Sequence, residues 1–157
     1  MRNIEKILNT LKVKFYKKSN KNNNRITYYC IIDFSENEDG LEEDELKKFS
    51  FIIVEELANK FIGIYGTSIM RVKQKDEIKV LKIINKENLE NVYGTLYINE
   101  ENEIEYYIGI STDSDEENIK TEQIHDYLSN MMIYSDSMIK KLIENNLTDD
   151  KSDTNEG

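Results

Sequence analysis

Cys30 and His125 are the single cysteine and the single histidine of the chain, and together they could form a nucleophile and its base. A cysteine nucleophile reacts as the thiolate and needs a base within hydrogen-bond reach. Cys30 alternates with apolar residues in a predicted strand, which is typical of a buried structural thiol, and His125 flanks an apolar helical stripe, where it should face solvent. One Cys and one His also fall short of the three or four nitrogen or sulfur ligands of usual zinc sites. The sequence therefore predicts no catalytic set, no metal site and no cofactor.

The acidic segment 35–48 invites comparison with a calcium-binding loop. Its Gly40 falls at the sixth position of the EF-hand pattern, where a sharp turn is needed. The first position is Ser35 and the twelfth is Leu46, so the first acidic ligand and the bidentate glutamate are both missing. We therefore interpret the segment as a solvated, charged loop.

The first 25 residues are basic, although the chain as a whole is acidic. They hold eight Lys or Arg and one Glu, a net charge of +7, which leaves −17 for the remainder. Four of these residues, Lys12, Lys14, Lys17 and Lys18, lie in the predicted hairpin 12–25. They could bind nucleic acid, or they could keep an edge strand from pairing and face an acidic surface of the same molecule or of a partner. We favour the second interpretation.

A second nucleic-acid signal is weaker. Residues 63–66 (GIYG) match the GxxG loop of KH domains, which clamps a phosphate backbone, but the interior of this match is apolar. We interpret it as the end of a strand. The net charge of −10 and the pI near 4.7 argue against non-specific binding to nucleic acid or anionic lipid. We therefore expect neither a nucleic-acid nor a membrane partner.

The length of 157 residues fits one domain, which we place at 1–147, followed by a disordered acidic tail at 148–157. No apolar run approaches the roughly 18 residues of a membrane-spanning helix. The single cysteine excludes an intrachain disulfide, and the first residues lack the uninterrupted apolar stretch of a signal peptide. These features predict a cytoplasmic protein.

Apolar periodicity predicts three helices and several strands. Helical spacing is found at 4–11, 76–91 and 119–146, with Asn3 and Asp76 as predicted N-caps. Alternating apolar residues predict strands at 12–18, 25–34, 49–56, 60–66, 93–99 and 103–111, with a short extended piece at 69–73. The order α-β-β-β(-β)-α-β-β-α predicts an α+β fold, in which helices pack on one face of an antiparallel sheet.

Tyrosines gather on the side of these strands that should face away from the helices. If Tyr28 and Cys30 face the core, alternation turns Tyr29 and Ile31 outward. The residues predicted to share this outer side are Thr27, Tyr29, Ile31, Tyr93, Thr95, Tyr97 and Tyr107. Tyrosine is enriched at interfaces, although β-propensity alone also favours it at half-exposed positions. The candidate partner-binding or dimer residues are therefore Tyr29, Ile31, Tyr93, Tyr97 and Tyr107.

Residues 81–88 (LKIINKEN) form an apolar helical segment that ends in paired asparagines. Residues 94–98 (GTLYI) then begin a strand, which is followed by an Asn/Glu turn, a second strand and the long helix. In this arrangement the segment 80–146 resembles the YbjN-type domain family, which is similar in fold to type III secretion chaperones. The resemblance implies a small, acidic, often dimeric cytosolic α+β protein without catalytic residues. It also implies that the protein acts as a regulator or as a chaperone for an extended client segment.

The main hypothesis is a non-enzymatic module that binds a protein or peptide partner, with a homodimer as a further expectation. A sheet binds an extended peptide by edge pairing or through side-chain pockets. The alternative hypothesis is a small enzyme or ligand-binding domain whose acidic residues form a site that the sequence does not reveal. A pocket that gathers several carboxylates would favour this alternative.

Overall fold

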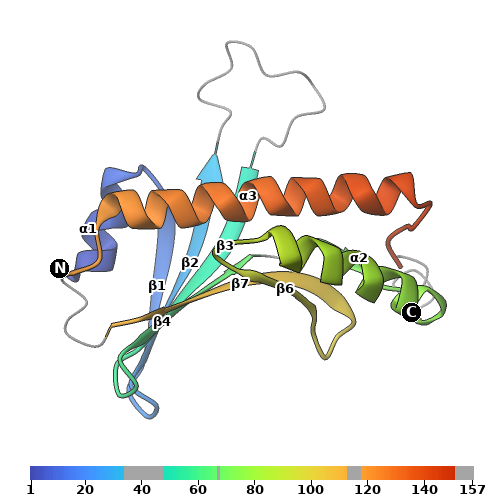
Figure 1. Ribbon diagram of the computed structural model, residues 1–157. Helices are drawn as coiled ribbons and strands as arrows, with labels where there is room; N and C mark the ends of the chain where they lie inside the picture. The colour runs from blue at the N-terminus through green and yellow to red at the C-terminus, as the bar shows by residue number, and fades with distance from the viewer. Residues whose placement is uncertain (34–47, 67, 113–117, 151–157) are drawn as a thin grey trace. The chain divides into compact units, whose positions relative to one another are not determined.

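The computed structural model describes residues 1–33, 48–66, 68–112 and 118–150, and its helices and strands are drawn in Figure 1. The helices are α1 (Asn3–Thr10), α2 (Glu77–Glu90) and α3 (Thr121–Glu144), and a short 3-10 helix, η2 (Gln74–Asp76), precedes α2. The strands are β1 (Lys14–Asn20), β2 (Arg25–Asp33), β3 (Lys48–Glu56), β4 (Phe61–Gly66), β5 (Met70–Arg71), β6 (Thr95–Ile98) and β7 (Glu103–Ser111). This element order confirms the predicted α+β fold.

The strands of the described residues form a seven-stranded sheet. Neighbouring strands are hydrogen-bonded in the order β1-β2-β3-β4-β7-β5, and β6 pairs with β7. Ile104 of β7 is the register partner of both Met70 on β5 and Ile98 on β6, which places β5 and β6 on opposite sides of β7. The pairs β1–β2, β2–β3, β5–β7 and β6–β7 are all antiparallel.

The chain divides into two compact units. Unit 1 comprises residues 1–65 and 109–127, and unit 2 comprises residues 66–108 and 128–157. In unit 1, α1 lies against the sheet face that we call the inner face. This face consists of the alternate residues Ile26, Tyr28, Cys30, Phe49, Phe51, Ile53 and Glu55, all of which are buried. Burial of this face together with Ile4, Ile7 and Leu8 of α1 forms the core of unit 1.

In unit 2, α2 and the C-terminal part of α3 are held against β6 and β7. The core of this unit includes Val80, Ile84, Leu96, Ile104, Tyr106, Ile108, Met131, Met138 and Leu142. The ring of Tyr106 stacks on that of Tyr134, with 6.3 Å between the ring centroids. The two helices are joined by an ion pair between Lys141 and the buried Glu87, to which Ser137 also donates a hydrogen bond of 3.3 Å.

The structure changes the predicted roles of the two helix caps. Arg2, not Asn3, occupies the N-cap of α1, because the Asn3 side chain donates a hydrogen bond of 2.9 Å to the carbonyl of Ile119. The backbone N–H of Arg2 donates to Glu5 Oε2 at 2.9 Å, so the first turn of α1 is capped through Glu5. Asp76 does stand at the N-cap of α2, but its side chain makes no capping hydrogen bond.

The two acidic segments are only partly described. Residues 34–47, which hold nearly all of the predicted acidic loop and the failed EF-hand match, lie outside the described residues, and so do residues 151–157. The first three residues of the predicted tail are described and lie along β5. The N–H of Arg71 donates to Asp149 Oδ1 at 3.1 Å, and the N–H of Asp150 donates to the carbonyl of Arg71 at 3.0 Å. In the described part of the chain, no helix is long and apolar enough to cross a membrane.

Candidate partner-binding surfaces

The face of β1–β3 opposite to the inner face is called here the outer face of unit 1. The strand register places Tyr16 beside Tyr29 and Tyr29 beside Ile52, with similar rows on either side. The outer face consists of Lys14, Tyr16 and Lys18 on β1, Thr27, Tyr29 and Ile31 on β2, and Ser50, Ile52 and Val54 on β3. The predicted candidates Tyr29 and Ile31 therefore lie on the same face.

The outer face of unit 1 exposes its aromatic side chains. Tyr16 is 67% exposed and Tyr29 is 46% exposed, whereas Tyr28 on the inner face is fully buried. The rings of Tyr16 and Tyr29 lie side by side, with 6.3 Å between their centroids. Ile31, Ile52 and Val54 are half-buried around them. Large aromatic side chains on paired strands lose little conformational freedom on binding, so this face is suited to contact with another macromolecule.

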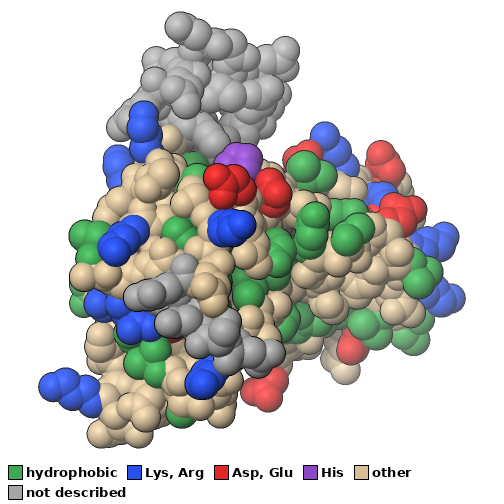
Figure 2. Space-filling view, turned by 60° about the vertical axis from the view of Figure 1, so that its left-hand side comes forward, with side chains coloured by type: hydrophobic (Ala, Val, Ile, Leu, Met, Phe, Trp, Pro, Cys, Tyr) green, Lys and Arg blue, Asp and Glu red, His purple; other side chains and the backbone are tan. Residues whose placement is uncertain are grey.

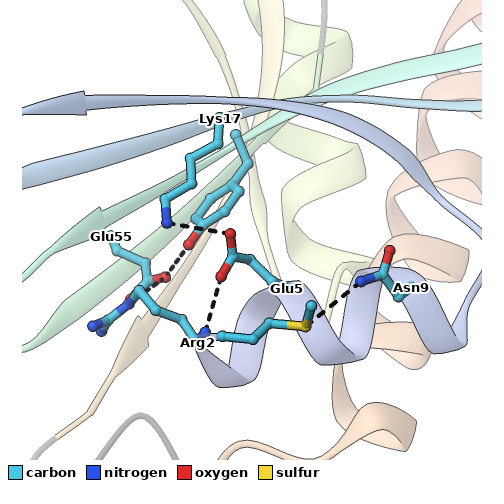
Figure 3. Close-up of polar contacts among 7 residues, drawn as sticks. Arg2, Glu5, Asn9, Lys17 and Glu55 are labelled. Carbon is cyan, nitrogen blue, oxygen red and sulfur yellow. Dashed lines mark hydrogen bonds and ion pairs between the residues drawn. The ribbon is translucent and has the colours of Figure 1, made fainter.

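A polar network on the opposite side of the sheet ties α1 to β3, as Figure 3 shows. Glu55 is 2% exposed, and its carboxylate accepts hydrogen bonds from Arg2 Nη2 at 2.8 Å and from the hydroxyl of Tyr28 at 2.9 Å. Arg2 Nε lies 3.2 and 3.3 Å from the two carboxylate oxygens. Lys17 pairs with Glu5 at 3.2 Å, which connects β1 to the same helix. The network fixes the strands whose other side carries Tyr16 and Tyr29.

In this network the Tyr28 hydroxyl is neutral and the Glu5 carboxylate is charged. Burial and the neighbouring Glu55 carboxylate raise the pKa of Tyr28 well above its ordinary value, so its hydroxyl remains a donor. Burial opposes ionisation of Glu5, but the Arg2 N–H and the Lys17 ammonium outweigh it and hold the pKa of Glu5 below its ordinary value. Glu5 therefore stays charged and paired at neutral pH.

The other three predicted candidates lie in unit 2. Tyr107 pairs with Thr95, and Tyr97 pairs with Glu105, so these residues share the outward side of β6 and β7. Tyr97 donates a hydrogen bond of 2.6 Å to Glu105 Oε2. Tyr93 lies in the turn before β6 and is 46% exposed. This second group is thus built around a carboxylate, whereas the outer face of unit 1 carries lysines.

The paired asparagines of the sequence have different roles in unit 2. Asn88 bonds to both backbone groups of Leu96, since its Nδ2 donates to the carbonyl at 3.0 Å and its Oδ1 accepts from the N–H at 2.8 Å. The side chain thereby occupies part of the edge of β6 in the manner of another strand. Asn85 is exposed. Asn91, just after α2, accepts hydrogen bonds from the N–H of Gly94 and from the hydroxyl of Tyr106.

The structure gives Cys30 and His125 the environments that the sequence predicts. Cys30 is buried, its thiol donates to the carbonyl of Tyr28 at 3.5 Å, and burial raises its pKa from 9.0 to about 12. His125, purple in Figure 2, is exposed at the surface and lies 3.5 Å from the carboxylate of Asp126. The thiol is therefore protonated at neutral pH, as expected for a structural cysteine.

Cys30 should resist alkylation in the folded protein. A pKa of about 12 in place of 9.0 lowers the thiolate fraction at pH 8 by about a thousandfold, and burial adds a steric barrier. With iodoacetamide at pH 8, we expect negligible labelling over an hour in buffer and complete labelling in denaturant, as measured by intact mass. Rapid labelling of the folded protein would contradict the buried placement of Cys30.

The remaining motifs show no site chemistry in the described residues. The GIYG match at 63–66 forms the last four residues of β4, as predicted for the end of a strand. Among residues 1–33, 48–66, 68–112 and 118–150, no group of three or more His, Cys, Asp or Glu side chains is placed to hold a metal ion.

The sequence did not indicate Tyr16 and Glu55 as site residues. Tyr16 and Lys18 alternate with Phe15 and Lys17, so strand parity alone indicates that they face outward with Tyr29. Glu55 follows Phe49, Phe51 and Ile53 at spacing two, which indicates a carboxylate on the buried side of β3. A charge at a core position is the available signal for a buried network.

Two solved structures are similar to this chain. YbjN from E. coli, described as a proposed transcription regulator, matches with a TM-score of 0.54 over 92% of this chain and 91% of that chain, at 10% identity. The chain has the fold of YbjN. A chain of the HopA1-SchA chaperone-effector complex matches with a TM-score of 0.52 over 86% of this chain and 88% of that chain, at 11% identity. The predicted resemblance to YbjN and to secretion chaperones is thus confirmed at the level of the fold.

No family model and no curated protein sequence matches the chain. At identities of 10% and 11%, the solved structures establish the fold alone.

Proposed function

We propose that the chain is a non-enzymatic protein-binding module, which holds a protein or peptide partner on the outer face of unit 1. The observation that carries this proposal is the pair of exposed, adjacent rings of Tyr16 and Tyr29 on a sheet whose other side is buried and tied to α1. Rigid aromatic side chains flanked by aliphatic ones are the usual anchors of protein interfaces.

The comparisons support this proposal. One neighbour in fold belongs to a chaperone-effector complex, which is an assembly of two proteins, and the other is a proposed transcription regulator. The group Tyr93, Tyr97 and Tyr107 in unit 2 is a second candidate contact area. The single, buried Cys30 favours a reducing compartment, such as the cytoplasm, as the place where the partner is met.

A site-specific crosslink tests the proposal. A photoreactive phenylalanine analogue replaces Tyr29 in the full chain, and irradiation in a lysate of the source cells is followed by mass spectrometry of the adducts. The control places the same analogue at Lys6, which is exposed on α1 of the same unit. We expect a discrete protein adduct from position 29 that is at least about tenfold more abundant than from position 6, because interface contacts are confined to one patch. Equal adducts, or none, would contradict the proposal.

A further inference from the structure

The outer face of unit 1 combines aromatic rings with positive charge. Lys14 and Lys18 lie two residues before and after Tyr16 on β1, so their side chains flank the Tyr16–Tyr29 pair on the same face, each about 7 Å along the strand. β1 carries no acidic residue. Both lysines are exposed.

The acidic residues of this face lie at its ends. Glu56 is bound by Arg25 at 2.7 Å, at the end of the rows near the β1–β2 turn. Asp33 is the register partner of Lys48, at the opposite end. Between these ends, the face carries Lys14 and Lys18 on β1, and Ile31, Ile52 and Val54 surround the tyrosines.

The negative charge of the rest of the chain makes the lysines of β1 the favoured contact for an acidic partner. Outside its first 25 residues the chain carries a net charge of −17, against +7 within them. An acidic partner is repelled by most of the molecule and attracted to β1, which selects both the partner and its position. A nucleic acid gains little here, because two lysines make few phosphate contacts and its many remaining phosphates stay unpaired.

We infer that the outer face of unit 1 binds an extended segment of a partner protein whose sheet-facing residues, every second residue of the segment, are alternately acidic and apolar or aromatic. The carboxylates of such a segment meet Lys14 and Lys18, while its apolar side chains pack on Tyr16 and Tyr29. Because only every second residue of an extended segment faces the sheet, residues i, i+2 and i+4 of the segment match Lys14, Tyr16 and Lys18 on β1. This inference rests on the proposed function and names the chemistry of the partner.

The test uses a fluorescein-labelled peptide, Glu-Ser-Phe-Ser-Glu-Ser-Ile-Ser-Glu, which presents its acidic and apolar side chains on the same side when extended, and fluorescence anisotropy with the full chain. We expect saturable binding that weakens about tenfold in the Lys14→Glu/Lys18→Glu variant, since two attractions become repulsions. The Tyr16→Ala/Tyr29→Ala variant should weaken binding by a similar factor, because the apolar contact is lost. The control variant Lys6→Glu/Lys120→Glu makes the same change in net charge at exposed positions outside the outer face, and it should change binding less than about twofold.

Other occupants of the face have distinct outcomes. A peptide with Lys in place of Glu should not bind, and equal binding of both peptides would overturn the inference. Tighter binding of an oligothymidine of equal charge would overturn it in favour of nucleic acid. A dimer by sedimentation that the tyrosine variant dissociates would assign the face to a second copy. Peptide binding that appears only after the seven acidic residues at 34–47 are changed to Ser or Asn would assign it to the chain's own segment.

These outcomes separate the inference from the proposed function. If a partner is crosslinked at position 29 but its binding is unaffected by the lysine variant, the proposed protein-binding function stands. Only the acidic character of the bound segment is then overturned. Absence of that crosslink would remove the proposed function itself.

Discussion

Replacement of Glu55 by alanine is expected to lower the free energy of unfolding by about 3 kcal/mol. The change removes the acceptor of the Tyr28 hydroxyl, and Tyr28 is fully buried, so its O–H loses its carboxylate partner in a site closed to solvent. It also removes the carboxylate that binds Arg2, whose side chain is 35% exposed and can turn to water. The larger share of the loss therefore comes from the orphaned hydroxyl and the vacated volume.

Chemical denaturation followed by circular dichroism measures this loss. The matched control is Glu56→Ala on the same strand, where the ion pair with Arg25 is exposed and should contribute less than about 1 kcal/mol. In the Tyr28→Phe background, Glu55→Ala should lower the free energy of unfolding by less than it does in the natural protein, because no Tyr28 hydroxyl is left unpaired. Equal losses for Glu55→Ala and Glu56→Ala would contradict the buried network.

Replacement of Gly94 by alanine is expected to lower the free energy of unfolding by about 2 kcal/mol. A Cβ at this position would lie 2.6 and 2.7 Å from ring carbons of Tyr106 and 2.7 Å from the carbonyl oxygen of Tyr107. The Tyr106 ring has no room to move, since it is fully buried, stacks on Tyr134 and donates its hydroxyl to Asn91. The backbone between α2 and β6 must therefore shift.

The control for this change is Gly66→Ala. A Cβ at Gly66 would lie 3.4 Å from the sulfur of Met131 and 3.5 Å from the Cβ of Tyr106, which are ordinary contacts, and methionine adapts readily. Its unfolding free energy should stay within about 0.5 kcal/mol of the natural protein, because the loss of glycine's freedom in the unfolded chain offsets the closer packing. Thermal unfolding of both variants gives the comparison. A Gly94→Ala variant as stable as Gly66→Ala would contradict the packing of Tyr106 in unit 2.

The element order was predictable because the strands and helices carry strong apolar periodicity. On β2, Tyr28 and Cys30 were expected inside with Tyr29 and Ile31 outside, and the burial of each agrees. Such patterns are local, since each residue's side of a strand follows from its neighbours alone. The resemblance of the segment 80–146 to YbjN-type proteins came from the same order of elements.

The roles of Asn3 and Glu55 depend on distant residues and could not be predicted. Asn3 looks like a helix cap in sequence, but its side chain bonds to Ile119, which is 116 residues away. Glu55 is held by Arg2, 53 residues earlier, and no local pattern indicates that partner. Contacts of this kind follow from topology, and topology is not encoded in periodicity.

The predicted tyrosine group is distributed over two units. Tyr29 and Ile31 lie in unit 1, where Tyr16 and two lysines join them, and Tyr93, Tyr97 and Tyr107 lie in unit 2 beside Glu105. Sequence alternation identifies the outward side of each strand, but it does not say which outward residues are neighbours across strands. The register supplied Tyr16, the most exposed aromatic of the outer face of unit 1.

The crosslink from position 29 tests most directly whether the outer face of unit 1 binds a partner protein. We expect a discrete protein adduct at position 29, its loss when Tyr16→Ala is added, and little adduct from the analogue at position 6 on α1. An adduct that is as abundant from position 6 as from position 29, or one that is unaffected by Tyr16→Ala, would contradict such binding.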